Sequence, residues 1–75
     1  MYYVYLLKSR AVNKTYIGYT NNLIRRLKEH KDKKSELIYY EAYKSKEDAR
    51  KREIILKQRG QAVRRLKEKL KSSLA

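Results

Sequence analysis

Two strand-like segments lie close together near the N-terminus, and they limit the folds open to the chain. Residues 2–7 read YYVYLL, an unbroken aromatic, β-branched and aliphatic run that is typical of a strand buried on both faces. Turn-forming residues then lead to a second short strand, TYIGY, at residues 15–19. Two strands so close in sequence predict an antiparallel hairpin, because parallel strands need a much longer connection.

A helix and a third strand are expected after the hairpin. The TNN sequence at residues 20–22 can cap a helix, and apolar residues at 23, 24 and 27 form one stripe along it. We therefore expect a helix that ends near residue 30 or 31. The HKDKKS stretch at residues 30–35 indicates a short solvated loop, and LIYYEAY at residues 37–43 predicts a third strand.

Two further helices complete the expected fold. Ser45 and Asp48 have the S-x-x-D/E form of a capping box, which predicts a helix from residue 46 to 58 or 59 with residues 49, 55 and 56 facing the core. Gly60 follows, where a helix commonly exits through a left-handed residue. A last helix is expected from apolar residues spaced by three and four: Val63, Leu66, Leu70 and Leu74. The predicted fold class is α+β, a small three-stranded antiparallel sheet flanked by three helices in the order β-β-α-β-α-α.

Composition limits the partners and the compartment. Seventy-five residues leave room for one core, so we expect a single domain over residues 1–75. Lysine and arginine total 21 against 8 acidic residues, and the net charge of +13 is spread along the chain, which favours binding to nucleic acid. There is no cysteine, no apolar run of about 18 residues for a membrane span and no signal peptide pattern. We expect a cytoplasmic protein that does not bind a membrane.

The aromatic residues point to a functional surface. All eight are tyrosines. A buried phenol must find a hydrogen-bond partner, so a purely structural core would ordinarily include phenylalanine. The choice of tyrosine indicates hydroxyl groups that reach a wet surface or a site.

Several short motifs resemble those of one nuclease family. Residues 3–5 (YVY) and 16–18 (YIG) resemble the paired GIY and YIG motifs of the GIY-YIG nucleases, and the first motif departs from that pattern at its first two positions. Residues 18–30 are similar to the family's segment from YIG into a helix, and residues 49–53 are similar to its later helix with a metal-binding glutamate. The resemblance covers nearly the whole chain and identifies it with the small stand-alone members.

The resemblance implies a catalytic site made from distant parts of the chain. It assigns Glu53 to a divalent cation, Mg²⁺ or Mn²⁺, as the sole protein ligand, which suits an ion that keeps several waters. It assigns Arg26 to the non-bridging oxygens of the scissile phosphate and His30, one turn further, to phosphate contact or proton relay. Either tyrosine could be the base, and we expect Tyr16 to deprotonate the attacking water and Tyr5 to position it. Substrate contacts are expected from Gly18, Arg25 and Lys28.

The implied function is a metal-dependent endonuclease that leaves a 5′-phosphate and a 3′-hydroxyl. DNA is favoured over RNA, with structure selectivity in repair or recombination and a separate protein partner for targeting. The alternatives are a basic nucleic-acid-binding module without turnover and a small ribonucleoprotein component. The short loop after residue 30 and the absence of asparagine after Glu53 favour a binding module, whereas the presence of Tyr16, Arg26 and Glu53 favours a nuclease. In either alternative Glu53 would simply pair with Lys57 or a neighbouring arginine.

Overall fold

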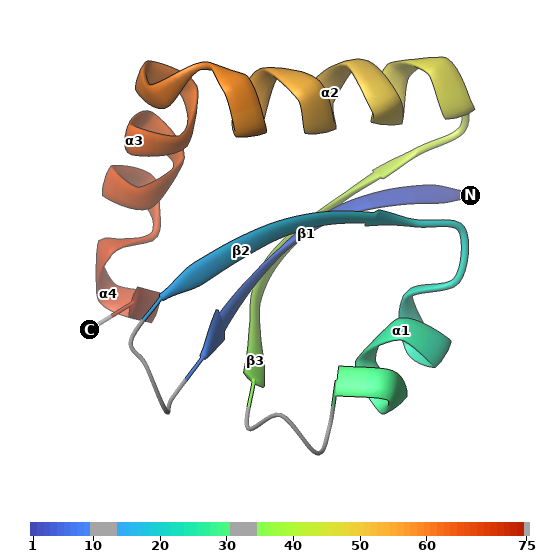
Figure 1. Cartoon of the computed structure of the whole chain (residues 1–75), viewed down its shortest axis with the longest axis horizontal. Coiled ribbons are helices and arrows are strands. Elements are labelled where there is room, and N and C mark those ends of the chain that lie inside the picture. The colour runs from blue at the N-terminus through green and yellow to red at the C-terminus, as the bar shows by residue number, and fades with distance from the viewer. Residues whose placement is uncertain (10–13, 31–34, 75) are drawn as a thin grey trace.

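The chain folds as one antiparallel sheet with helices around it. The computed structural model describes residues 1–9, 14–30 and 35–74, and for residue 30 the backbone alone (Figure 1). The expected loop at residues 30–35 therefore falls largely outside the described residues. In chain order the elements are β1 (Tyr2–Ser9), β2 (Thr15–Thr20), α1 (Leu23–His30), β3 (Ser35–Tyr43), α2 (Lys46–Gln58), α3 (Gly60–Lys69) and α4 (Lys71–Leu74).

The sheet confirms the expected α+β class. Its strand order is β2-β1-β3 and both pairings are antiparallel, so the most apolar strand lies in the centre. In the hairpin, Tyr5 lies opposite Gly18 and Leu7 lies opposite Tyr16. The pairing of β1 with β3 shifts register between Leu6 and Leu7. β2 and β3 are the two edges of an open sheet, and the helices α2 and α3 lie on one side of it (Figure 1).

Alternate residues of β1 face different surroundings, because successive strand side chains point to opposite faces. Val4 packs with Ala49 of α2, Leu56 of α2 and Leu66 of α3 in the buried core. Tyrosines and other half-buried residues pack around this cluster, namely Tyr2, Ile17, Tyr19, Tyr39, Tyr43, Ala62 and Leu70. Tyr5 and Leu7 face the other way and are buried too, which confirms that the central strand is covered on both faces.

Helix α2 begins as the sequence predicts and ends differently. The Ser45 hydroxyl accepts a hydrogen bond from the backbone N–H of Asp48 at 3.4 Å, so the expected cap is present. The expectation of a left-handed exit at Gly60 is wrong. Arg59 is extended, its N–H donates to the Ile55 carbonyl (2.9 Å) and its own carbonyl accepts from Ala62 (3.0 Å). One extended residue thus ends α2 and starts α3, and Gly60 is already helical.

Two expectations for the C-terminal half need correction. The last helix is interrupted at Leu70, whose backbone (φ −103°, ψ 19°) ends α3 before the short α4 begins. Leu70 still packs against the core, so the apolar stripe is kept across the break. Ile55 was expected in the core but is 37% exposed, because Ala49 and Leu56 occupy the buried face of α2. No helix in the described ranges is long and apolar enough to span a membrane.

Candidate active site

A cavity of about 700 Å³ is lined by residues from all three strands and from the helices α1 and α2. Five of the predicted site residues line it: Tyr5 from β1, Tyr16 and Gly18 from β2, Arg26 from α1 and Glu53 from α2. Arg50 and Lys57 of α2 are the other charged residues of the lining. The uncharged remainder of the lining is Leu7, Ser9, Ile17, Tyr19 and Ser35. Three cationic side chains and one carboxylate therefore line the cavity, an arrangement suited to an anionic ligand.

Gly18 makes room for Tyr5. A Cβ added at Gly18 would overlap the Tyr5 hydroxyl oxygen and two of its ring carbons. The two residues are direct partners across the hairpin, so the phenol lies over the bare backbone of the glycine. A substrate contact is the expected role of Gly18, and the overlap with Tyr5 is a separate reason for this residue to lack a side chain. Tyr5 is only 6% exposed although its ring borders the cavity.

The charges around Tyr5 come from both sides of the cavity. Burial raises the pKa of Tyr5, because the phenolate loses hydration. Arg26 and Lys57 oppose this rise in pKa, whereas Glu53 and Glu29 add to it. Charged residues of both α1 and α2 thus influence this one phenol.

Tyr16 occupies a different environment. Its side chain is 49% exposed, at the rim of the cavity, and its backbone lies opposite Leu7 near the start of β2. Tyr5 is therefore the enclosed phenol of the pair and Tyr16 is the one open to solvent.

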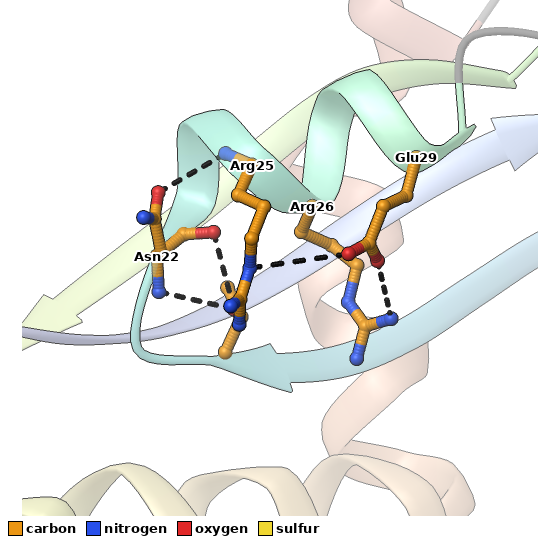
Figure 2. Close-up of polar contacts among 5 residues, drawn as sticks. Asn22, Arg25, Arg26 and Glu29 are labelled. Carbon is orange, nitrogen blue, oxygen red and sulfur yellow. Dashed lines mark hydrogen bonds and ion pairs between the residues drawn. The ribbon is translucent and has the colours of Figure 1, made fainter.

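Helix α1 is capped and charged at its first turn (Figure 2). The Asn22 side-chain oxygen accepts a hydrogen bond from the Arg25 N–H at 3.0 Å, as expected for a helix cap. Arg26 donates to Glu29 at 3.1 Å, and the Arg25 guanidinium lies 3.9 Å from the same carboxylate. Arg26 lines the cavity, but Arg25 and Lys28 are exposed and lie outside its lining.

Two further residues of this helix, one predicted and one not, bear on the site. The side chain of His30, at the end of α1, lies outside the described part of the chain, so its expected role stays a prediction. Glu29 was not singled out from the sequence. Its position three residues after Arg26 and four after Arg25 was the available signal, because such pairs lie on one helix face.

Glu53 is the only carboxylate among the described residues that line the cavity. Its side chain is 13% exposed and lies 3.1 Å from the Lys57 ammonium and 3.5 Å from the Arg50 guanidinium. These are the helix ion pairs that the sequence allowed. Arg50 and Lys57 were not assigned to the site beforehand, although their spacing from Glu53 placed them on its face of α2.

The donor set suits a loosely held divalent cation. Within the described ranges, no three or more His, Cys, Asp and Glu side chains gather as a metal-binding group. One half-buried carboxylate beside an open cavity still fits Mg²⁺, which keeps several waters and takes further ligands from a substrate phosphate. Any such cation must share Glu53 with Lys57 and Arg50, so its affinity in the free protein should be low.

The fold and this cavity define the class: a small α+β domain in which phenols, guanidinium groups and a single carboxylate line one cavity. Residues 1–68 match the family described as the GIY-YIG catalytic domain. The chain therefore belongs to the GIY-YIG family, a family of endonucleases. No curated protein and no solved structure gives a significant match to the chain.

Proposed function

We propose that the protein is a divalent-metal-dependent endonuclease that hydrolyses phosphodiester bonds of nucleic acid. One observation carries the proposal: Tyr5, Arg26 and Glu53, from three different elements, line the same cavity. Phosphodiester hydrolysis needs a deprotonated water, positive groups that neutralise the negative charge of the phosphate oxygens, and alignment of the water with the phosphate. The lining side chains offer a group for each of these needs.

Arg26 is proposed to bind the non-bridging phosphate oxygens, since a guanidinium can donate to two of them at once. Its present partner, Glu29, is exposed and can release it. Glu53 would hold Mg²⁺ or Mn²⁺, which supplies Lewis-acid charge to the phosphate when bound. His30 is proposed to contact the phosphate or relay a proton.

Tyr16 is proposed as the base that takes a proton from the attacking water, and Tyr5 as the residue that positions that water. The difference in environment supports this division. Burial raises the pKa of Tyr5, which makes its phenolate harder to form near neutral pH. Tyr16 lies at the open rim, where water reaches it directly.

The nucleic-acid substrate, the cellular role and the location are part of the same proposal. The net charge of +13 supports nucleic acid as the ligand. We favour DNA over RNA, selectivity for a branched or flapped structure, work in repair or recombination, a cytoplasmic location and a separate targeting protein. Arg25 and Lys28, exposed beside Arg26, are proposed to contact the backbone that flanks the cleaved bond.

A basic binding module without turnover is the second candidate, and the ion pairs of Glu53 favour it. A carboxylate already placed between Lys57 and Arg50 has partners without any cation. In that case Glu53 serves the helix, and the protein binds nucleic acid without cutting it, with or without a divalent cation.

Incubation with branched, flapped and single-stranded DNA, with and without Mg²⁺ or Mn²⁺, tests the two candidates. Wild type should cut only with the cation. Glu53→Ala should abolish cleavage and keep or strengthen binding, because it removes one negative charge from a basic cavity. Glu47→Ala is the matched control, since it removes one exposed carboxylate from the first turn of the same helix. Binding without cleavage by wild type on every substrate would favour the binding module.

A further inference from the structure

A polar cluster outside the cavity ties α2 to the strand at the far edge of the sheet. The Glu41 carboxylate, 15% exposed, accepts hydrogen bonds from Nε of Arg52 at 2.9 Å and from the terminal nitrogen Nη2 at 3.1 Å. It also accepts from the phenols of Tyr39, at 2.7 Å, and Tyr43. Four donors thus converge on one carboxylate.

This cluster is built to hold its geometry. A guanidinium fork on a carboxylate fixes direction as well as distance. Burial raises the pKa of Glu41, but hydrogen bonds from Arg52, Tyr43 and Tyr39 more than offset it, and the pKa lies below its ordinary value. The carboxylate therefore stays ionised, and the bridge stays charged, at neutral pH.

Arg52 and its neighbour Glu53 point to opposite sides of the helix's buried face. At 3.6 residues per turn, Arg52 lies about 60° to one side of Ala49, and Glu53 lies about 40° to the other. Ala49 and Leu56 face the core over the central strand. Arg52 bonds to β3, one edge of the sheet, and Glu53 borders the cavity at β2, the opposite edge.

We propose that the Arg52–Glu41 bridge is a positioning device that fixes the rotation of α2 about its axis and so sets where the Glu53 carboxylate lies in the cavity. Ala49 and Leu56 hold α2 on the core, and Arg50 lies over the Tyr19 ring of β2, 4.9 Å from its centroid. Hydrophobic contact is not directional. The fork on β3 adds a directional constraint on the rotation of α2. The functional part of this inference rests on the proposed nuclease activity.

A modest rotation has a large effect at the end of a side chain. A glutamate carboxylate lies about 6–7 Å from the helix axis, so a rotation of about 20° moves it by about 2 Å. Misplacement of a catalytic group by about 1 Å can lower a rate by about 100-fold. Loss of the bridge should therefore reduce turnover while leaving the cationic binding surface nearly intact.

Arg52→Met tests the bridge, with Lys51→Met as the control, because each removes one positive charge from α2 and Lys51 is exposed. We expect kcat on a cleaved DNA to fall by roughly 10- to 100-fold in Arg52→Met. KM should match that of Lys51→Met within about twofold, because both variants lose the same charge. Arg52→Lys should restore turnover only in part, since an ammonium is a point charge without the fork. Equal kcat in Arg52→Met and Lys51→Met would overturn the proposal.

A readout without activity separates this inference from the proposed function. Backbone amide chemical shifts of Tyr5 and Gly18, across the sheet from residue 52, should move in Arg52→Met and stay in place in Lys51→Met. If Arg52→Met fails to fold, Glu41→Gln replaces it as the variant that weakens the bridge, because it removes the carboxylate charge and keeps the size of the side chain. Chemical-shift changes confined to β3 and the nearest turn of α2 would contradict a positioning role for the bridge, even in an active enzyme. Shifts at Gly18 in a protein that cuts no substrate would support the bridge and refute the nuclease.

Discussion

Replacement of Gly18 by alanine tests whether Tyr5 is held where the structure places it. The new Cβ would overlap the phenol oxygen and ring of Tyr5, so the ring must move. Tyr5 cannot simply swing aside, because it is 6% exposed and enclosed by its neighbours. The collision therefore has to be relieved by distortion of the hairpin or by partial exposure of the ring.

The expected size follows from the cost of overpacking. Forcing extra atoms into a packed site typically costs about 1–3 kcal/mol, and the lower entropy of the unfolded alanine chain returns up to about 1 kcal/mol. Together these give a net loss between about 0 and 3 kcal/mol. A mid-range loss of about 1–2 kcal/mol corresponds to about 4–16 °C in Tm for a domain of this size. Cleavage should fall by at least about tenfold, since the displaced phenol would no longer align the attacking water.

Gly60→Ala is the matched control. A Cβ at Gly60 meets nothing within 4 Å and the residue begins a helix, so stability should stay the same or rise by up to about 1 kcal/mol. Urea unfolding followed by circular dichroism measures both variants. The collision also predicts that Gly18→Ala is harmless when Tyr5 is already alanine, a coupling that a double-mutant cycle detects. Equal stability of Gly18→Ala and wild type, with full cleavage, would refute the reasoning.

Two further predictions concern the charged groups. Burial and a hydrogen bond to Glu41 raise the pKa of Tyr43 from 10.0 to about 12, so its stabilising contribution is present below pH 10 and is lost as the pH rises toward 12. Urea unfolding at several pH values in that range should show a smaller alkaline loss of stability in Tyr43→Phe than in wild type, and an identical loss would contradict the hydrogen bond. Arg26→Ala should reduce cleavage by about 100- to 1,000-fold and lower the salt slope of DNA binding by about 0.7–0.9. Arg25→Ala should change the slope equally but retain cleavage within severalfold, so equal cleavage defects in the two variants would argue against a special role for Arg26.

Local patterns in the sequence were enough to predict most of the elements. The hairpin followed from two apolar segments a few residues apart, and the start of α2 followed from Ser45 and Asp48, because such signals depend only on neighbouring residues. The way in which α2 ends did not follow from its sequence, since a glycine after a helix is equally compatible with the first turn of another helix. The break at Leu70 was hidden because the apolar spacing continues across it.

The site was only partly accessible to sequence reasoning. Tyr16, Arg26 and Glu53 came from the family resemblance, and no periodicity in the chain relates a strand near the N-terminus to a residue of α2. The Glu41 cluster was also missed, although one part of it left a signal in the sequence. The tyrosines two positions on either side share its strand face, which the period of a strand could have shown. Its pairing with Arg52 depends on how α2 packs over the sheet, which is a tertiary contact.

The proposal that distant residues converge on one cation-binding cavity is tested most directly by Mn²⁺ titration of the isotope-labelled protein, followed by paramagnetic broadening of its amide signals. Broadening should begin at Tyr5, Gly18 and Glu53 together, three positions from three elements, and should disappear in Glu53→Gln. If the broadening instead centres on the exposed acidic turn at Glu47 and Asp48 and leaves Tyr5 and Gly18 sharp, the cavity does not bind a cation as the proposed nuclease requires.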